Sequence, residues 1–368
     1  MSELLKDTMN ERASGATTPH IDIDSIIATG DRRVRRNRAV GVGAAAAAVV
    51  AAAVFVPAMI NGLGDGPRNQ AAAGVGFEQR SLTWATGSAI HYGDDTLEVG
   101  RPVKTFVQTD DGFTYVSGTE VYFADGTSNQ LIGATDQPYG IVLAAGDSGS
   151  YVAWLDTAAD AFTVYDTGER EVVASEPTAV SSDEEFGIPT VNAVDGTTAY
   201  WFSDGESIAY DIESGEATVL ADGVTNGWLI DVANGQVATQ AEPESGNQIA
   251  IGADPANPSA LVPGNSHITL SVDATYAATD PNDSEQVFRV SDGADVTPAT
   301  PGYGFIAVVQ WIDDDRYTAL GLSEGDPEGQ PFDLLTCSVS GGTCEVAVED
   351  AATVAEIAFP VGADIRDD

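Results

Sequence analysis

The sequence contains few of the residues that build nucleic-acid sites, zinc modules and disulfide-dense scaffolds. Among 368 residues there are 2 cysteines, 3 histidines and 15 basic side chains, and only Lys6 and Lys104 are lysines. Clustered Lys and Arg supply affinity for phosphate, so the composition predicts no nucleic-acid partner and argues against an anionic lipid surface. Two cysteines also exclude a Cys-rich zinc module and a disulfide-dense mini-scaffold.

Acidic residues are abundant instead, and they are unevenly placed. The chain has 57 Asp and Glu and a net charge of -42, while 43% of its residues are apolar, enough for a large core. Met1–Arg38 holds 7 basic and 6 acidic residues, so 15 − 7 = 8 basic and 57 − 6 = 51 acidic residues follow it. The negative charge therefore belongs to the part of the chain after residue 38, and Ala39–Ile60 contributes none of it.

Ala39–Ile60 has 22 residues without a charged or polar side chain. A helix of this length spans about 33 Å, enough for the ~30 Å hydrocarbon core of a bilayer. Five arginines stand directly before it: Arg32, Arg33, Arg35, Arg36 and Arg38. By the positive-inside rule they set the topology, so we expect a single-pass membrane protein with residues 1–38 in the cytoplasm and the C-terminal part outside.

Two alternatives to a retained membrane helix at Ala39–Ile60 remain open, and the segments on either side of it are too short to be domains. The segment is rich in alanine and could be a buried helix, or it could be a signal peptide cleaved after Val56–Ala58 or Ala71–Ala73. Residues 1–38 are too few for a stable domain; they form either a solvated leader or a docking peptide for transmembrane signalling. Residues 61–76 are rich in Gly and Ala and predict a flexible tether.

From residue 77 to 368 the sequence repeats short β-rich runs closed by tight turns. The clearest unit has four strands in Lys104–Thr109, Phe113–Ser117, Glu120–Ala124 and Gln130–Ile132, separated by Asp-Gly and Gly-Thr turns. Similar units occupy residues 140–174 and 191–220, and others start near 227, 267 and 305. In two of them the third strand ends alike, at Tyr165-Asp166 and Tyr210-Asp211, and Trp154, Trp228 and Trp311 each stand shortly before an Asp.

Four-stranded units of ~40–45 residues are typical of a β-propeller. The sequence therefore predicts an all-β, six- or seven-bladed propeller of four-stranded antiparallel blades, preceded by a single transmembrane helix. The run from Ser81 to Val99 is one strand short, so we expect the strand within Thr353–Phe359 to complete the first blade and close the ring. One or two β-sandwiches are the alternative fold.

The N-terminal runs Leu4–Thr8 and Asp31–Arg36, the Ala-rich helix and the blades together resemble a known family. The chain is similar to membrane-anchored, WD-repeat-like or TolB-like β-propeller proteins of high-GC Gram-positive bacteria. This resemblance implies an extracytoplasmic domain and supplies no catalytic residues. The Gly-His and Trp-Asp dipeptides of true WD repeats are missing, so the hydrogen-bond tetrad of that family is not expected.

Candidate chemistry is sparse. Cys337 and Cys344 flank a hairpin turn, which predicts a disulfide, with two buried free thiols as the alternative. His91 and His267 are the histidines beyond the helix, and neither stands in a catalytic motif. Three acidic runs offer oxygen ligands suited to calcium: Asp183–Glu185, Asp280–Glu285 and Asp313–Asp315. Solvated, mutually repelling surface loops are the favoured interpretation of these runs, and a calcium site is the alternative.

No cofactor, catalytic motif or bound metal is otherwise predicted, and an enzyme is not expected. The sequence favours a binding or sensing module in the cell envelope, anchored in the cell membrane by one helix and engaging an envelope protein or glycan. The alternatives are a glycosidase-like envelope hydrolase of the propeller type, which needs a pair of carboxylates, and transmembrane signalling through residues 1–38.

Overall fold

The computed structural model describes residues 76–137, 140–178, 189–222, 229–240, 248–264, 268–279, 285–323 and 330–363. The predicted cytoplasmic segment 1–38, the transmembrane helix 39–60 and the tether up to residue 75 lie outside these ranges, and their boundaries stay predictions. Within the described ranges, no helix has the length and apolar character needed to cross a membrane.

The strands form seven antiparallel sheets of four strands each. Each sheet is a blade, in which the strands are named from the innermost to the outermost. Blade 1 contains β28 (Ile357–Ala358), β1 (Thr83–Thr86), β2 (Ala89–Tyr92) and β3 (Asp95–Glu98). Blade 2 contains β4 (Thr105–Thr109), β5 (Gly112–Ser117), β6 (Glu120–Ala124) and β7 (Asn129–Ala134). Blade 3 contains β8 (Leu143–Ala145), β9 (Tyr151–Asp156), β10 (Ala161–Asp166) and β11 (Glu171–Pro177).

The other four blades follow in chain order. Blade 4 contains β12 (Thr190–Asp195), β13 (Thr198–Ser203), β14 (Glu206–Asp211) and β15 (Glu216–Asp222). Blade 5 contains β16 (Leu229–Ala233), β17 (Gln236–Gln240), β18 (Gln248–Gly252) and β19 (Ala260–Pro263). Blade 6 contains β20 (Ile268–Leu270), β21 (Tyr276–Thr279), β22 (Gln286–Arg289) and β23 (Ala294–Asp295). Blade 7 contains β24 (Tyr303–Trp311), β25 (Arg316–Ser323), β26 (Phe332–Ser338) and β27 (Thr343–Ala352), and the short 3-10 helix η2 (Val354–Glu356) leads on to β28.

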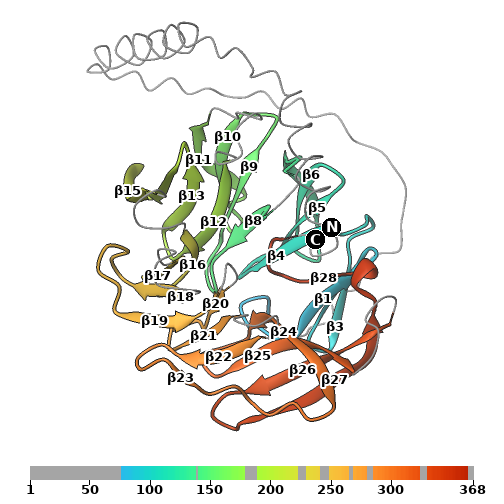
Figure 1. Ribbon diagram of the computed structural model, residues 1–368. Coiled ribbons are helices and arrows are strands. Elements are labelled where there is room, and N and C mark those ends of the chain that lie inside the picture. Colours follow the sequence, from blue (N-terminus) through green and yellow to red (C-terminus); the bar gives the residue numbers. More distant parts are fainter. Residues whose placement is uncertain are drawn as a thin grey trace, which may run out of the picture. The chain divides into compact units, whose positions relative to one another are not determined.

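The blades stand around a common centre, with their innermost strands nearest to it (Figure 1). Successive innermost strands are in contact from β4 through β8, β12, β16 and β20 to β24. The ring closes because β28, near the C-terminus, pairs with β1: Ala358 lies opposite Ala85, and Ile357 lies opposite Thr86. The predicted closure of the first blade by the C-terminal strand is therefore confirmed, and the protein is a seven-bladed β-propeller.

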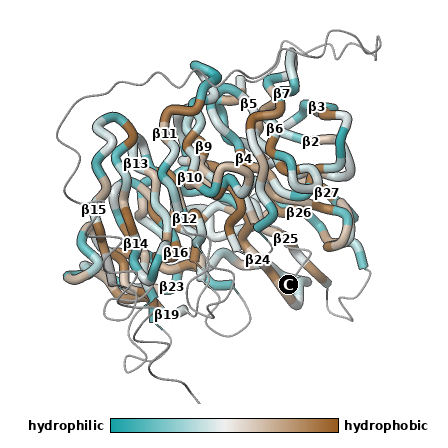
Figure 2. Tube along the Cα trace, turned by 90° about the horizontal axis from the view of Figure 1, so that it is seen from above, coloured by the Kyte–Doolittle hydropathy of each residue, from teal (hydrophilic) through white to brown (hydrophobic). Residues whose placement is uncertain are grey.

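The core is divided among the blade interfaces. Seven clusters of buried apolar side chains are present, one at each of the seven contacts between neighbouring blades, including the contact of blade 7 with blade 1. Apolar residues run along the strands, and hydrophilic residues gather at the turns (Figure 2). A β-sandwich has one core between two sheets, so this arrangement excludes the alternative fold.

The structure narrows one sequence-based expectation and differs from two others. The blade number, expected as six or seven, is seven. The closing strand is only Ile357–Ala358, because residues 354–356 form the 3-10 helix. The tryptophans do not mark equivalent positions: Trp154 belongs to the second strand of its blade and Trp311 to the first, while Trp228 lies outside the described residues. The shared end of the third strands at Asp166 and Asp211 is confirmed.

Blades 2 and 3 are joined by a clamp around Asp125. Its carboxylate accepts hydrogen bonds from the backbone N–H groups of Thr127 (2.7 Å) and Ser128 (2.6 Å), and it forms an ion pair with Arg170 from the turn before β11. Burial alone raises the pKa of Asp125, but the hydrogen bonds from Ser128 and Thr127 outweigh it and lower the pKa to about 2. The charged carboxylate therefore stabilises the folded state.

We expect Asp125→Ala to lower the free energy of unfolding at pH 6 by about 1–2 kcal/mol, after a discount for screening by solvent. Because the folded pKa lies below the ordinary value of 3.8, this contribution is present above about pH 4 and is lost as pH falls towards 2. Urea unfolding of both proteins from pH 6 to 2.5 measures the difference. The control Asp292→Ala removes an exposed pair with Arg289 and should change stability by less than about 1 kcal/mol. If the loss of unfolding free energy in Asp125→Ala stays the same as the pH falls, the lowered pKa of Asp125 is not the source of its stabilising effect.

Candidate functional site

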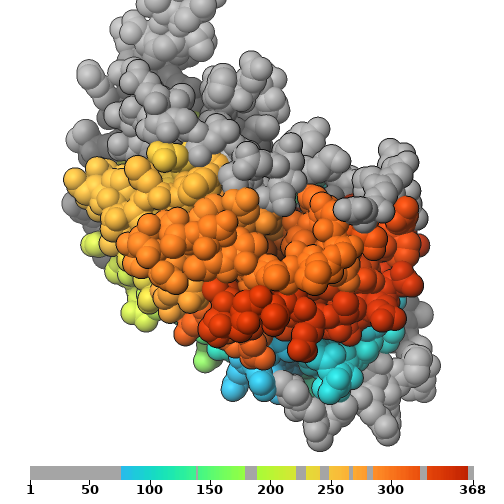
Figure 3. Space-filling model, turned by 60° about the horizontal axis from the view of Figure 1, so that its bottom comes forward, coloured from blue at the N-terminus to red at the C-terminus, as the bar shows by residue number. Residues whose placement is uncertain are grey.

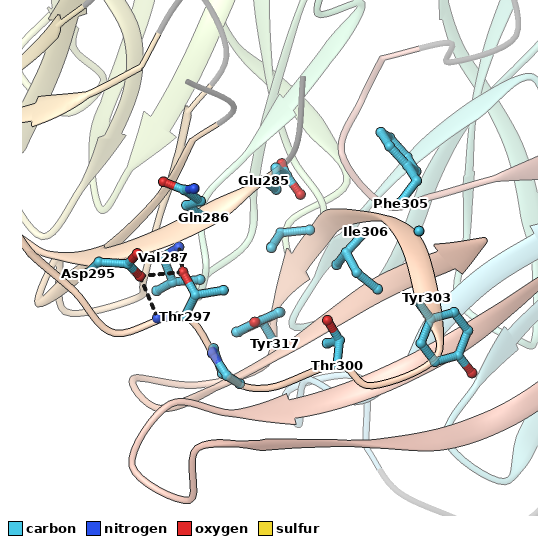
Figure 4. A pocket seen from close by; sticks show the side chains of 13 residues that line it. Glu285, Gln286, Val287, Asp295, Thr297, Thr300, Tyr303, Phe305, Ile306 and Tyr317 are labelled. Carbon is cyan, nitrogen blue, oxygen red and sulfur yellow. Dashed lines mark hydrogen bonds between the residues drawn. The ribbon is translucent and has the colours of Figure 1, made fainter. Parts of the chain in front are cut away.

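A cavity of about 210 Å³ lies between blades 6 and 7, where β22 and β24 begin. Its lining comes from the start of β22, from the connection between β23 and β24, and from β24 and β25. The surfaces of the two blades adjoin in the space-filling view, in orange and red (Figure 3). The close-up view shows side chains from both blades directed towards the space between them (Figure 4).

One wall of the cavity is held by Tyr303. Its ring lies against the backbone of Gly321, where an added Cβ would meet the Tyr303 Cδ1 at 2.7 Å. The Tyr303 hydroxyl donates a hydrogen bond of 2.7 Å to Asp333 Oδ2. Burial and this hydrogen bond to a carboxylate raise the pKa of Tyr303 to about 12, so the phenol stays protonated. The glycine and the carboxylate together fix the position of the ring.

The opposite rim is fixed by Asp295 and Thr297. Asp295 Oδ1 accepts hydrogen bonds from the Thr297 backbone N–H (3.0 Å) and hydroxyl (2.6 Å). The Thr297 hydroxyl oxygen in turn accepts a hydrogen bond of 2.9 Å from the backbone N–H of Val287 in β22. This chain of bonds ties the connection between blades 6 and 7 to the third strand of blade 6, so the cavity is built into the fold.

The cavity combines an acidic group with apolar surface. Glu285 stands at the start of β22 and is only 8% exposed. Burial, and then the negative charge of Glu285, raise the pKa of the Tyr317 phenol, which also lines the cavity. Apolar contact comes from Val287, Ile306 and Phe305, and the Phe305 side chain is 40% exposed.

A second charged feature lies at the centre of the ring, at the turns between the first and second strands. The Arg80 guanidinium donates hydrogen bonds to the carbonyl oxygens of Gln108 (2.6 Å), Gly146 (2.8 Å) and Asp147 (2.9 Å). Asp147 is exposed to solvent, but partial desolvation by the protein groups crowded around it raises its pKa, with Arg80 opposing the shift and the carboxylates of Asp195 and Asp314 adding to it. Since these acids come from blades 3, 4 and 7, they face one mouth of the central channel.

Of the two histidines beyond residue 60, the structure describes His91. His91 lies in β2, its ring stacks on Trp84 with centroids 4.7 Å apart, and Nδ1 lies 3.1 Å from the Thr96 hydroxyl. Burial lowers its pKa, with Glu98 acting in the opposite direction. Blade 1 does not contribute to the cavity between blades 6 and 7, and His267 lies outside the described residues. His91 is therefore not among the residues that line this cavity.

The acidic runs suggested for calcium have different surroundings. Asp313 accepts a hydrogen bond from the backbone N–H of Arg316. Asp315 accepts hydrogen bonds from the Ser338 hydroxyl and the Ser340 backbone N–H. Among the described residues no group of three His, Cys, Asp or Glu side chains is placed to hold a metal ion. Residues 183–185 and 280–283 and the topology-setting arginines 32, 33, 35, 36 and 38 lie outside the described ranges, so calcium binding and topology stay predictions.

The predicted disulfide between Cys337 and Cys344 is formed. The two residues lie opposite each other in the register of β26 and β27, with Cα atoms 4.0 Å apart. Cys337 is fully buried in the cluster between blades 6 and 7. The bond therefore joins the outermost hairpin of blade 7 next to the interface that holds the cavity.

We expect the double variant Cys337→Ala/Cys344→Ala to lose about 2–3 kcal/mol of stability, since a short loop is no longer closed in the unfolded chain. Thermal unfolding with and without dithiothreitol measures this loss. Reductant should lower the unfolding midpoint of the natural protein and leave the double variant unchanged. An equal response of both proteins to reductant would contradict the prediction.

Sequence reasoning did not find the cavity or the Arg80 anchor. In the sequence Glu285 is the last residue of an acidic run, and no motif distinguishes Arg80. Among so many acids, no local signal distinguishes Glu285, because its role depends on packing between two blades. The exposed aromatic Phe305, two residues beyond Tyr303 at the start of a blade, is the one local feature that suggests a binding surface.

Comparison with known proteins identifies no family for this chain. No family model and no curated protein matches the chain. Similar solved structures include a chain of the mitotic checkpoint complex, with 13% identity over 80% of this chain and 90% of that one and a TM-score of 0.45. Hsv2 of Kluyveromyces lactis has 12% sequence identity over 65% of this chain and 75% of its own, with a TM-score of 0.40. The AfRom2 CNH domain has 12% sequence identity over 67% of this chain and 88% of its own, with a TM-score of 0.41.

Proposed function

We propose that this protein is a binding module of the cell envelope that engages another protein through the cavity between blades 6 and 7. In this proposal Ala39–Ile60 anchors the chain in the cell membrane, residues 1–38 stay in the cytoplasm, and the acidic propeller lies outside. The apolar length of that segment and the arginines before it support the orientation. A disulfide is also typical of an exported domain.

The observation that carries the proposal is the exposed Phe305 at the edge of a built cavity. A large aromatic side chain next to a concave, partly apolar site with fixed polar groups is typical of a protein-binding surface. The cavity is also smaller than the about 300–1,000 Å³ of usual small-molecule sites. A site of this size fits one side chain of a larger partner.

Photo-crosslinking tests the binding function. A photoreactive amino acid replaces Phe305 in the full-length chain, expressed in its own host, and a matched control carries it at Leu131. Leu131 is also an exposed apolar residue, at 54%, but it belongs to the outermost strand of blade 2. We expect a defined protein adduct at Phe305 only. No adduct at Phe305, or the same adducts at both positions, would overturn the proposal.

A topology fusion tests the location separately. Alkaline phosphatase folds only outside the cytoplasm, so a fusion after Gly76 should be active. A cytoplasmic control fusion after Arg38 should be inactive, because it ends before the apolar segment. An inactive fusion after Gly76 would remove the proposed orientation.

A further inference from the structure

Two segments from opposite ends of the propeller's sequence contact the same two innermost strands, β4 of blade 2 and β8 of blade 3. The entry segment, Phe77–Arg80, comes shortly before β1. The closing segment, Ile357–Ala363, begins with β28 in blade 1 and continues beyond it. In Figure 1, β28 and β8 lie on either side of β4 near the centre of the ring. Each segment therefore reaches from blade 1 to the two blades that follow it.

The entry segment crosses β4 and β8 near the ends of these strands. The Arg80 guanidinium donates one hydrogen bond to the carbonyl oxygen of Gln108 in β4. It donates two more to the carbonyl oxygens of Gly146 and Asp147, directly after β8. The Gln108 side chain also donates a hydrogen bond of 2.8 Å to the Phe77 carbonyl oxygen. Because the guanidinium is planar and its donors are fixed, these bonds require one particular spacing of the two strands.

The closing segment crosses the same two strands near their beginnings. The Gly362 N–H donates a hydrogen bond of 3.1 Å to the carbonyl oxygen of Phe106 in β4. The Gly362 carbonyl oxygen accepts hydrogen bonds from the N–H groups of Val142 (2.8 Å) and Leu143 (3.1 Å) at the beginning of β8. A single residue is thus bonded to β4 through its N–H and to β8 through its carbonyl group.

The residue after Gly362 repeats this arrangement. The Thr105 hydroxyl in β4 donates a hydrogen bond of 2.9 Å to the Ala363 carbonyl oxygen. Ala363 also forms an isolated antiparallel bridge with Ile141, shortly before β8. Two successive residues of the closing segment are therefore held from both sides, so their hydrogen bonds also require the native spacing of β4 and β8.

The spacing between β4 and β8 is the geometric property on which both segments depend. These strands belong to different sheets, so the ladder of hydrogen bonds within a blade does not join them. Apolar side chains that include Val107 and Leu143 pack between the two blades, and the two crossing segments fix the distance at either end of the strands. When one segment is released, the strands can move apart, and the hydrogen bonds of the other segment weaken. Since coupling between two sites is reciprocal, each segment stabilises the other.

We propose that the entry and closing segments form one coupled latch, so that release of either segment loosens the other and opens the ring at blade 1. Blade 1 is the point of opening because β28 pairs with β1 through only two residues, Ile357 and Ala358. The entry segment is also the end to which residues 1–75 are attached, so a displacement of the chain at that end is transmitted to the closing strand. Opening of the ring in this way needs no partner and does not depend on the proposed binding function.

Hydrogen exchange of the full-length protein, resolved to single amides by mass spectrometry, tests the coupling. The N–H groups of Val142 and Leu143 report on the closing segment, since both are bonded to Gly362. The Asp110 N–H reports on the entry end, because it donates a hydrogen bond of 3.0 Å from blade 2 to the Gly149 carbonyl oxygen in blade 3.

A distant amide distinguishes local opening from a general loss of stability. The Gly235 N–H in blade 5 donates a hydrogen bond of 2.7 Å to the Asp195 carboxylate in blade 4. Neither β4 nor β8 takes part in this contact, so the exchange rate of Gly235 should be the same in all variants.

We expect Arg80→Met to accelerate exchange at Val142 and Leu143 about tenfold or more, although these amides lie at the other end of β8 from the lost guanidinium. Arg80→Lys keeps the charge and should give a smaller acceleration at the same amides, so it serves as the test if Arg80→Met does not fold. The matched control Arg289→Met removes an arginine from an exposed ion pair with Asp292 in blade 6 and should change none of the reporters.

The reciprocal change is made at the closing segment. Thr105→Val removes the hydroxyl that is bonded to Ala363 and leaves a side chain of similar size. We expect it to accelerate exchange at Asp110 about threefold or more, because coupling acts in both directions. In the double variant Arg80→Met/Thr105→Val, the acceleration at Leu143 should be smaller than the product of the two single accelerations, since the first change has already loosened the second segment.

Any of three results would overturn the coupled latch. Unchanged exchange at Val142 and Leu143 in Arg80→Met would mean that Arg80 acts only where it binds. Accelerations that multiply in the double variant would mean that the two segments are independent. An equal acceleration at Gly235 would mean that the whole propeller is loosened. These measurements do not involve the cavity between blades 6 and 7, so such a result leaves the photo-crosslinking test at Phe305 unaffected.

Discussion

Replacing Gly362 by alanine is expected to produce the largest loss of stability, because this residue holds the closing segment of the ring. Gly362 follows β28 and lies against the innermost strands of two blades. Its carbonyl oxygen accepts hydrogen bonds from Val142 and Leu143, and its N–H donates to the carbonyl of Phe106. An added Cβ would lie 1.7 Å from the Leu143 carbonyl oxygen, and its φ of +69° is unfavourable for residues other than glycine.

The backbone at Gly362 must shift to remove this clash, and the three hydrogen bonds weaken together. We expect Gly362→Ala to lower stability by about 3 kcal/mol or more, and the unfolding midpoint by about 6 °C or more. Thermal unfolding followed by circular dichroism measures the shift. Native-state hydrogen exchange should also show faster exchange in β1, which loses its partner β28 when the closing segment detaches.

Gly118 provides the matched control for this prediction. It has a similar φ of +63°, but an added Cβ would meet nothing within 4 Å. Gly118→Ala should therefore show only the conformational penalty of about 1 kcal/mol. A midpoint for Gly362→Ala equal to that of Gly118→Ala would show that close contact with Leu143 does not control ring closure.

Replacing Arg80 by methionine is the second change with a large expected effect. The variant removes the donor for three carbonyl oxygens of blades 2 and 3 and the positive charge beside Asp147. We expect a loss of about 2–4 kcal/mol at pH 7, since hydrogen bonds to a charged group contribute more than neutral ones. Arg80→Lys keeps the charge but cannot reach three acceptors with one planar group, so its loss should be smaller.

The effect of pH provides a specific signature of the Arg80 variant. The folded pKa of Asp147 is already above its ordinary value, so the charged carboxylate destabilises the folded state at neutral pH. Without Arg80 this pKa rises further. The destabilisation by Arg80→Met should thus be greatest at pH 7 and diminish as the pH falls through the raised pKa and the carboxylate takes up a proton.

Urea unfolding at pH 7 and pH 5 measures this dependence. The control Arg289→Met removes an arginine whose ion pair with Asp292 is exposed on both sides, and it should cost less than about 1 kcal/mol at either pH. An Arg80→Met variant as stable as Arg289→Met would mean that the three hydrogen bonds from Arg80 to blades 2 and 3 do not stabilise the propeller.

Much of the strand pattern could be predicted because its signals are local. Phe113–Ser117 and Glu120–Ala124 were expected as strands and correspond to β5 and β6 within one residue. Alternating β-branched and aromatic residues favour extended backbone, and Asp-Gly turns allow positive φ in the hairpins. The pairing of Cys337 with Cys344 was predictable for the same reason, since a short hairpin places both residues opposite each other.

Features that join distant segments could not be predicted in the same way. The short strand Ile357–Ala358 was expected to be longer, because nothing in the local sequence shows where the 3-10 helix ends. The cavity depends on how Tyr303 packs on Gly321, and on the hydrogen bond between Thr297 and Val287. Each contact joins residues that are ten or more positions apart in the sequence, and their residue types are common elsewhere in the chain.

By itself, the sequence determined the all-β class, the four-stranded repeat, the closure by the C-terminal strand and the acidic charge of the part after residue 60. Periodicity, turn residues and composition carry that information, and each depends on neighbouring positions in the chain. Only the tertiary structure decided the seven-blade count, the Arg80 anchor and the cavity with Glu285. The physical reason is that these features depend on side-chain packing and hydrogen bonding between segments that meet only when the ring is closed.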